Sequence, residues 1–247
     1  MSNTTQKDWT ADSLAEAATT LAGTDGAQIV AWSLERFGPR TALACSFSLE
    51  DVALVHLASQ SGLPFRVIAL DTGRLHEETL QVAQRLQERY AITVEWYVPQ
   101  QDELEALVRE AGPFSFRSSL EARKQCCEVR KIRPLRRALA ETPAWLTGLR
   151  RDQGQTRTKL PIIQRDESFG GIVKLNPLAD WTDEHLAAFA EEHKLPRNSL
   201  YEDGFTSIGC APCTRPTRPG EHPRAGRWWW EDPSHSECGL HQGRHHR

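Results

Sequence analysis

The segment TALACSFSLEDVALVHLASQSGLPFRVIALD, residues 41–71, decides the fold class. Residues 41–47 and 66–71 are short apolar runs of the kind found in buried strands, and residues 50–60 between them carry apolar side chains at helical spacing. A strand, a helix and a second strand in this order form a crossover unit, which places two parallel strands in one sheet. The segment therefore predicts an α/β fold.

The same alternation continues along the chain. Residues 92–98 and 144–149 are further apolar runs, and helical patterns lie at residues 76–90, 104–111 and 183–193. A parallel sheet needs helices on both of its faces, because the crossover connections cover it. The pattern indicates a parallel-sheet core of the nucleotide-binding type with helices on both faces.

The end of the chain reads differently from the rest. Beyond Pro161 the periodicity loosens, and the last twenty residues contain three consecutive tryptophans, the motif ECGLH and a polar terminus. Such a stretch cannot form a core by itself. We therefore expect one domain over residues 1–227, followed by a mobile C-terminal tail over residues 228–247.

Composition indicates a globular protein of the cytoplasm. Of 247 residues, 39% are hydrophobic, and the formal net charge is -3. The first residues lack the basic start and apolar run of a signal peptide, and no apolar stretch approaches the roughly 18 residues that cross a bilayer. Because cytosolic thiols are kept reduced, the six cysteines point to metal binding or redox chemistry rather than to disulfides.

Four of the cysteines form two local pairs. Cys126 and Cys127 are adjacent, and Cys210 and Cys213 form a CxxC pair. Four thiolates satisfy the ligand count of a tetrahedral zinc ion or of an iron–sulfur cluster, with inert buried cysteines as a third reading. Adjacent cysteines project in divergent directions, which favours a larger cluster whose separate irons each take one sulfur.

The other two cysteines differ from each other. Cys45 lies within an apolar strand, where packing explains it. Cys238 lies in the tail beside Glu237, Gly239 and His241. An exposed thiol near cationic groups has a lowered pKa and is nucleophilic.

One stretch is strongly basic on an otherwise acidic chain. Residues 117–137 contain eight basic residues against two acidic ones, Glu121 and Glu128. Such an excess predicts a bound anion, and the alternative is a solvated basic helix face. In parallel sheets ligands lie at the carboxyl ends of the strands, here SFSLED (46–51), DTGRLHEE (71–78) and GLRRDQ (148–153). The first two lead into predicted helices, whose N-termini suit a phosphate or sulfate, although Ser48 alone is explained as a helix cap.

The cysteine pairs and their surroundings carry a family resemblance. The motifs are KQCCEVRKIRPL (124–135), TGLRRDQ (147–153), GCAPCTRP (209–216), PRAGRWWWE (223–231) and ECGLH (237–241). With them the chain resembles the assimilatory adenylyl sulfate reductases, the cluster-containing branch of the phosphoadenylyl sulfate reductase family. The motifs run in the family's order across nearly the whole chain. The implied core is an adenine-nucleotide-binding fold of the ATP pyrophosphatase type.

The resemblance implies a reaction in two steps. Cys238 as thiolate attacks the sulfur of adenylyl sulfate, AMP leaves, and an S-sulfonated cysteine remains. A thioredoxin dithiol then releases sulfite and restores the thiol, so the two electrons come from thioredoxin. The product would serve sulfate assimilation towards cysteine.

The resemblance also assigns residues. It implies a 4Fe-4S cluster on the cysteines of the two pairs: Cys126, Cys127, Cys210 and Cys213. It implies a catalytic group of Cys238, His241 and Lys131. It implies substrate contacts at Ser46, Ser48, Leu70, Thr72, Gly148, Arg224 and Arg227, and the basic residues Arg150, Arg151 and Arg157 are further candidates. The cluster is expected to act in structure and electrostatics rather than as an electron relay. On a helix, Lys131 would share a face with Cys127, four residues before it.

Three alternatives remain open at this point. An ATP pyrophosphatase or sulfate adenylyltransferase subunit would need a Gly-rich pyrophosphate loop, and the turn here reads SFSLED. A zinc module for nucleic acid, built on the four paired cysteines, would interleave aromatic and basic residues, which this chain does not do. Reduction of the 3'-phosphorylated nucleotide, PAPS, is the third; cluster-bearing members of the family mostly favour the unphosphorylated form. We expect no nucleic-acid or membrane partner, and a homo-oligomer is left open.

Overall fold

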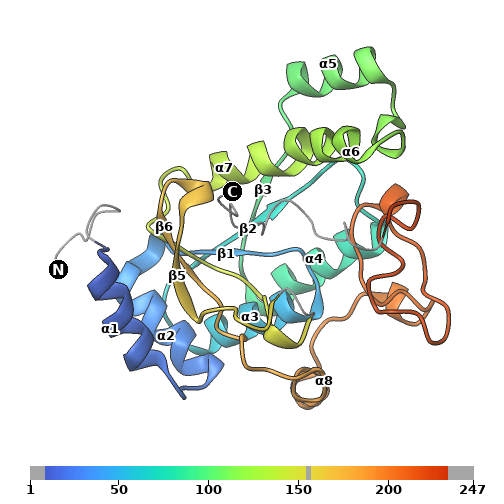
Figure 1. Ribbon diagram of the computed structural model, residues 1–247. Coiled ribbons are helices and arrows are strands. Elements are labelled where there is room, and N and C mark those ends of the chain that lie inside the picture. Colours follow the sequence, from blue (N-terminus) through green and yellow to red (C-terminus); the bar gives the residue numbers. More distant parts are fainter. Residues whose placement is uncertain (1–8, 154–156, 233–247) are drawn as a thin grey trace. The chain divides into compact units, whose positions relative to one another are not determined.

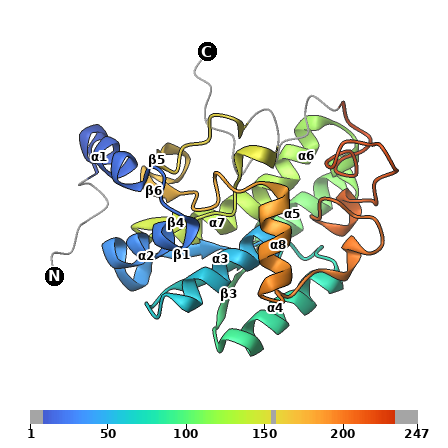
Figure 2. The same cartoon turned by 90° about the horizontal axis from the view of Figure 1, so that it is seen from below.

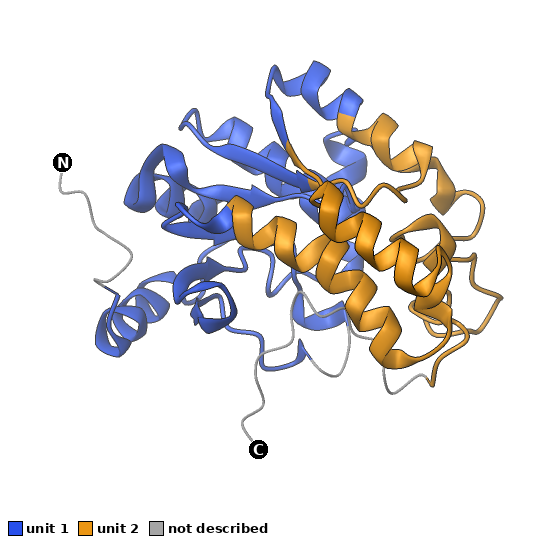
Figure 3. Ribbon diagram, turned by 90° about the horizontal axis from the view of Figure 1, so that it is seen from above, with its two compact units in different colours: residues 1–69, 84–95, 139–196 blue, residues 70–83, 96–138, 197–247 orange. Residues whose placement is uncertain are grey.

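The protein is described by a computed structural model that covers residues 9–153 and 157–232. The chain divides into two compact units, each made of three separate stretches (Figure 3). Unit 1 comprises Met1–Ala69, Gln84–Glu95 and Leu139–Pro196, and unit 2 comprises Leu70–Ala83, Trp96–Ala138 and Arg197–Arg247. A single domain over residues 1–227 stays a prediction, and a mobile tail over residues 228–247 lies mostly outside the described residues.

A six-stranded sheet has the strand order β3-β2-β1-β4-β6-β5 (Figure 1). The strands are β1 (Ala42–Ala44), β2 (Arg66–Leu70), β3 (Val94–Tyr97), β4 (Ala144–Leu146), β5 (Ile163–Asp166) and β6 (Ile172–Leu175). β1 pairs in parallel with β2 and with β4, and β4 pairs in parallel with β6. The four strands expected from the sequence are therefore all present, and the α/β fold class is confirmed.

The sheet is mixed rather than wholly parallel, which corrects the expectation. β5 runs antiparallel to β6 and forms an edge of the sheet. A short turn joins these two strands, and Gly170 and Gly171 both adopt positive φ in it, which a non-glycine residue rarely does. Both strands were missed, because β5 is a short edge strand with charged residues and β6 contains a lysine.

Helices surround the sheet. They are α1 (Ala11–Leu21), α2 (Gly26–Phe37), α3 (Leu49–Gln60), α4 (Glu77–Tyr90), α5 (Gln101–Ala111), α6 (Leu120–Cys127), α7 (Arg133–Leu139) and α8 (Asp183–Glu192). Within unit 1, α3 packs against β1, α2 and α8, and α1 packs against β5 (Figure 2). α3, α4, α5 and α8 match the predicted helices within a few residues, whereas α1, α2, α6 and α7 were not predicted.

Among the described residues, no helix is long and apolar enough to span a membrane.

Helix α3 is mostly apolar because it lies in the core. From Asp51 to Ala58 every residue of this helix is buried, because other helices pack around it. A helix that is apolar on all sides reports burial in a core.

A buried ion pair joins strands β5 and β6 at the edge of the sheet. Lys174 on β6 lies 3.8 Å from an oxygen of Asp166, and the two side chains are 4% and 11% exposed. The Lys174 ammonium also lies over the ring of Trp145, 4.8 Å from its centroid. Burial lowers the pKa of Lys174 to about 8, against the attraction of Asp166.

We predict that Asp166→Asn lowers the free energy of unfolding by about 3 kcal/mol at pH 7, because a buried lysine loses its counter-ion. Asn keeps the acceptor that caps Ser168, so the change isolates the charge. The variant's Lys174 pKa should fall further below the unfolded value of 10.5, so its folded state binds fewer protons and gains stability as pH rises. Thermal unfolding at pH 7 and pH 9 should show the deficit against wild type shrinking at the higher pH. An unchanged deficit would contradict the assignment, and Lys174→Met with Asp166→Asn should recover most of the loss.

Candidate functional site

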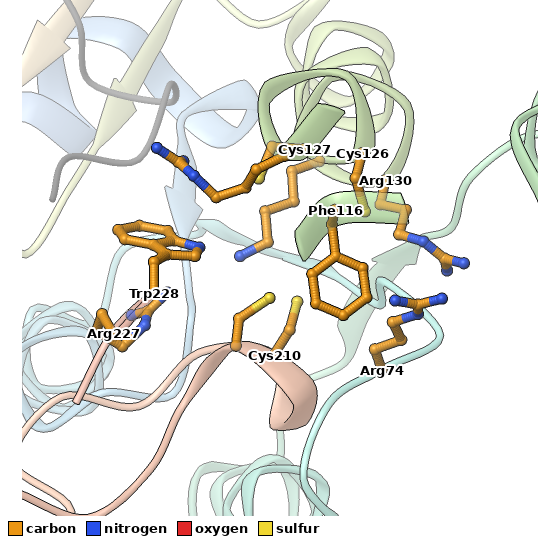
Figure 4. A pocket seen from close by; sticks show the side chains of 11 residues that line it. Arg74, Phe116, Cys126, Cys127, Arg130, Cys210, Arg227 and Trp228 are labelled. Atoms are coloured by element: carbon orange, nitrogen blue, oxygen red, sulfur yellow. The ribbon is translucent and has the colours of Figure 1, made fainter. Parts of the chain in front are cut away.

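One pocket of unit 2 is lined by all four paired cysteines (Figure 4). Its empty volume is about 380 Å³, part of which is open to solvent. The remaining lining residues are mostly cationic or aromatic: Arg74, Phe116, Arg123, Arg130, Lys131, Arg227 and Trp228. Figure 4 shows Cys126 and Cys127 on one side of the pocket and Cys210 on the other. Two pairs that lie 82 residues apart in the chain therefore meet at one place.

Helix α6 and the turn after it present the first pair. Ser119 caps the helix by accepting from the backbone N–H of Ala122, and the two cysteines are its last residues. A π-helical turn, Glu128–Ile132, follows directly, and its closing bond runs from the Arg133 N–H to the Glu128 carbonyl. We predicted that Lys131 follows Cys127 in a regular α-helix. It lies in this widened turn instead. It nevertheless lines the pocket with the cysteines.

A tight loop presents the second pair. The N–H of Cys213 donates to the carbonyl of Cys210 at 2.9 Å, and the hydroxyl of Thr214 donates to the same carbonyl. The N–H of Ala211 donates to the Arg74 carbonyl at 2.8 Å, which ties the loop to the segment after β2. Pro212 restricts the loop further. Both sulfurs are therefore fixed by backbone geometry rather than by side-chain packing alone.

The sulfurs influence one another across the pocket. Burial raises the pKa of Cys213 to about 12, and the neighbouring Cys210 and Cys127 sulfurs raise it as well. Burial also raises the pKa of Cys126, while Arg130 and Arg74 oppose the rise. Four thiolates cannot collect here without positive charge to offset their repulsion.

Cys210 is the exception. Burial would raise its pKa, but the charge of Lys131, a hydrogen bond to Thr72 and the charge of Arg227 together lower it. The Thr72 hydroxyl lies 3.3 Å from the Cys210 sulfur, and both groups are buried. Thr72 was expected among the nucleoside contacts; its hydroxyl lies beside a cysteine, and the nucleoside contact stays a prediction.

A single metal ion is the alternative to a cluster for this donor set. A tetrahedral zinc ion with Zn–S bonds of about 2.3 Å brings its sulfurs to about 3.8 Å from one another. In residues 9–153 and 157–232, no three His, Cys, Asp or Glu side chains converge to hold one ion. A larger, multi-iron cluster accepts sulfurs that are farther apart and carries net negative charge, which fits the cationic lining. The buried Nε atoms of Arg130 and Arg227 have no hydrogen-bond partner within the described part of the chain.

Unit 1 contains a second constellation, where the segments after β1 and β4 meet. Asp51 accepts hydrogen bonds from the N–H and the hydroxyl of Ser46, at 2.6 and 2.7 Å, and from the backbone N–H of Gly148. A Cβ on Gly148 would lie 2.5 Å from the Asp51 Oδ1 atom and 2.7 Å from the Cβ of Glu50. Burial raises the pKa of Asp51 to about 6, although the hydrogen bonds from Ser46 oppose the rise. Gly148 is thus required by close approach of the two segments.

The comparisons with known proteins agree on one family. Residues 40–216 match the phosphoadenosine phosphosulfate reductase domain. An adenosine 5'-phosphosulfate reductase of Burkholderia cepacia is 48% identical over 198 residues, which are 80% of this chain and 79% of that protein. The chain belongs to the phosphoadenosine phosphosulfate reductase family.

A plant relative and two solved structures are also similar to this chain. A probable chloroplastic 5'-adenylylsulfate reductase of Oryza sativa subsp. japonica is 45% identical over 90% of this chain, which spans about half (48%) of that protein. A phosphoadenylyl-sulfate reductase of Candida auris, in complex with phosphate, superposes with a TM-score of 0.73 at 26% identity, over 84% of this chain and 98% of the other. Yeast FAD synthetase, at 16% identity and a TM-score of 0.54, covers 85% of this chain and 71% of its own, and shares the fold alone. The family predicted from the cysteine motifs is confirmed.

The residues expected to contact the substrate have different surroundings. Arg227 lies across Gly209, where a Cβ would meet the guanidinium at 2.2 Å, and its Nη1 donates to the Ile208 carbonyl. Its guanidinium also lies 4.6 Å from the centroid of the Trp228 ring. The backbone N–H of Arg224 donates to a ring nitrogen of His222. Leu70 ends β2 and is half-buried.

The arginines after β4 have protein partners. Arg150 is 3% exposed and donates to Glu50, to Asp183 and to the Trp181 carbonyl. Arg151 pairs with Asp180, and Arg157 donates to Gln153. These bonds anchor the segment after β4 within unit 1. A direct role of these arginines in substrate binding stays a prediction.

Some predicted residues behave as expected, and others lie outside the described residues. Cys45 is buried at the end of β1, as a packing residue should be. Ser48 stands at the N-cap of α3, but its side chain makes no capping hydrogen bond. Cys238 and His241 are not among the described residues, and their roles stay predictions.

Six of the eight basic residues in residues 117–137 fall into two groups. Arg123, Arg130 and Lys131 line the cysteine pocket, whereas the remaining arginines between residues 133 and 137 bind other groups: Arg133 and Arg136 pair with acidic side chains and Arg137 donates to a carbonyl. Sequence reasoning expected a bound anion from this stretch but did not single out Arg123 or Arg130. Their spacing was the available signal, because Arg123 precedes Cys126 by three residues and Arg130 follows it by four.

We predict that Gly148→Ala lowers the free energy of unfolding by about 2–3 kcal/mol, because the new methyl group must displace Asp51 and Glu50. Gly170→Ala is the matched control, since a Cβ there meets nothing within 4 Å and only the left-handed φ of 79° is penalised, by about 1 kcal/mol. Thermal unfolding of both variants provides the measurement. Equal losses would mean that crowding at Gly148 is absent.

Proposed function

We propose that this protein reduces adenylyl sulfate to sulfite and AMP. The observation that carries the proposal is the meeting of an adjacent cysteine pair and a CxxC pair in one cation-lined pocket, in a chain whose bacterial and plant relatives are named reductases of this nucleotide. The product sulfite would enter sulfate assimilation towards cysteine, and we place the protein in the cytoplasm. A pyrophosphate-cleaving activity has no support in the SFSLED turn, which lacks a glycine-rich loop.

The four cysteines would hold a 4Fe-4S cluster. Supporting this are the pocket that all four cysteines line and the surrounding guanidinium groups. A cluster bound there contributes negative charge and a covalent tie between α6 and the 210–213 loop. Lys131 then offsets that charge on one side and remains close to the cysteines.

Sulfur transfer would take place at Cys238. Its thiolate forms an S–S bond with the sulfate sulfur, the S–O bond to the phosphate breaks, and AMP leaves with the electron pair. A thioredoxin dithiol then attacks the cysteine sulfur, sulfite departs, and thioredoxin becomes a disulfide, so that the two electrons are accounted for. Lys131, Arg224 and Arg227 are the cations that would stabilise the charge on the departing phosphate, with His241 beside the nucleophile.

The nucleotide is proposed to use the segment after β1. Ser46 is held there by Asp51 through two hydrogen bonds, so its position is set before substrate arrives. The N-terminus of α3 follows at once and has the positive dipole end that an anion favours. Preference for the unphosphorylated nucleotide follows from the names of the relatives and from the cysteine pairs.

We predict that Cys238→Ser abolishes sulfite release and the mass increase of an S-sulfonated enzyme, while iron content and adenylyl sulfate binding persist. Wild-type protein purified without oxygen should release sulfite from adenylyl sulfate faster than from its 3'-phosphorylated form. Serine at Cys126, Cys127, Cys210 or Cys213 should remove iron, and Cys45→Ala is the matched control that should keep iron and activity. A colourless, iron-free wild-type protein would refute the cluster, and an S-sulfonated Cys238→Ser enzyme would refute the nucleophile.

We also predict that adenylyl sulfate binds more weakly as pH falls through about 6, where Asp51 becomes protonated. The neutral acid presents an O–H to Ser46 and Gly148, which are themselves donors, so the segment after β1 loses its support. Calorimetry on the Cys238→Ser protein between pH 5 and pH 8 measures the affinity without turnover. Asp51→Asn should bind about tenfold more weakly at pH 8 and show little change with pH, since one lost charged hydrogen bond is worth about 1.5 kcal/mol. A parallel pH dependence in that variant would exclude Asp51 as the titrating group.

A further inference from the structure

A buried ion pair joins the cysteine helix to the end of the described chain. Arg123 on α6 is 1% exposed, and its Nε lies 2.7 and 2.9 Å from the two carboxylate oxygens of Glu231. The Glu231 side chain is itself 10% exposed. The two residues are 108 positions apart in the sequence. Both partners are therefore withdrawn from water at a contact that the chain makes over a long loop.

Trp228 reinforces this contact. Its ring lies beneath the Arg123 guanidinium, 4.4 Å from the centroid, and is 3% exposed. The backbone N–H of Trp228 donates to the Cys213 carbonyl at 3.2 Å, and its backbone carbonyl accepts from the N–H of Glu231 at 2.8 Å. Trp228 also has a φ of 46°, a left-handed conformation that a tryptophan adopts only when its surroundings enforce it. The turn from residue 228 to residue 231 is thus fixed to α6 and to the CxxC loop at once.

The position of this turn limits where the Cys238 thiol can go. Cys238 lies seven residues after Glu231, so an extended chain carries its Cα at most about 25 Å from that of Glu231. Any displacement of the turn moves the whole range that the thiol can reach. Effective concentration in an intramolecular step depends on this starting point.

We propose that Arg123 and Glu231 are positioning residues for sulfur transfer, since their ion pair anchors the start of the segment that carries Cys238. The inference rests on the proposed function of Cys238 and extends it to two residues outside the proposed catalytic group. Removing the Glu231 charge leaves Arg123 buried without this counter-ion and lowers stability, so the test has to separate the rate of sulfur transfer from stability. Trp228 supplies the platform on which the pair is oriented.

The test uses Glu231→Gln, which keeps the shape and one acceptor but removes the charge. The full-length enzyme is mixed with saturating adenylyl sulfate without thioredoxin, and S-sulfonation is followed by intact mass in a rapid quench. We expect the rate to fall about 10- to 100-fold, the loss typical of a misplaced reacting group. Affinity for adenylyl sulfate, measured in the Cys238→Ser background, and iron content should stay at the wild-type values.

Glu221→Gln is the matched control. Glu221 also forms a two-oxygen pair with Arg215 in unit 2, at 2.9 and 3.1 Å, which is more exposed and lies outside the cysteine pocket. This variant should react at the wild-type rate. Arg123→Lys provides a second variant of the pair, and it should give an intermediate rate because a lysine keeps the charge but not the fork.

Each outcome has a distinct meaning. A Glu231→Gln enzyme that S-sulfonates within twofold of wild type overturns the anchoring role alone. Loss of iron and of affinity in proportion to the rate assigns the pair to general stability and also overturns it; should Glu231→Gln not fold, Arg123→Lys decides by the same criteria. A wild-type enzyme that forms no adduct instead refutes the proposed chemistry of Cys238, and the anchoring role with it.

Discussion

Electrostatic repulsion between sulfurs is the constraint on which the cysteine pocket depends. Burial and the neighbouring sulfurs raise the pKa of Cys213 to about 12, so the four groups do not ionise together without help. The lining cations supply that help, and each is held in turn. Arg130 donates to the Thr72 carbonyl, Arg227 to the Ile208 carbonyl and Arg123 to Glu231. Removing a cation would therefore raise the pKa of the sulfurs that it faces.

The same rule governs unit 1, where buried charges also have partners. Asp51 is satisfied by donors of the segments after β1 and β4, and Arg150 by Glu50 and Asp183. Such bonds hold loops in one position, because breaking them would leave an unpaired charge in a dry site at a high cost in free energy. Hence a charged residue can hold a loop in place. Arg150 illustrates this, since its guanidinium is almost wholly occupied by protein groups.

The sequence predicted those features that depend on neighbouring residues. Apolar runs marked β1 to β4, and the spacing of the cysteines marked the metal-binding candidates. β6 was missed because its buried Lys174 interrupts the apolar pattern. α2 was also missed, although the capping box of Asp25 and Gln28 was an available signal. The family resemblance alone named Lys131, Arg224 and Arg227 as anion-binding candidates, and that role stays a prediction. Contacts between distant segments were out of reach, because pairs such as Arg123 with Glu231 or Thr72 with Cys210 form only when the chain has folded. The crowding of Asp51 against Gly148 is of the same kind, and it explains a glycine that a motif alone leaves unexplained.

The π-helical turn after the adjacent cysteines has a cause that can be read from the sequence and an effect that only the fold shows. Pro134 has no N–H to donate to the carbonyl of Arg130, and its ring would clash with that carbonyl in a regular α-helix. The helix widens just before it, so that Arg133 bonds to Glu128, five residues back. Within this stretch two consecutive cysteines and two consecutive cations, Arg130 and Lys131, all line the same pocket. A regular α-helix directs neighbouring side chains about 100° apart, so a widened turn is a physical means of bringing adjacent cations to bear on adjacent sulfurs.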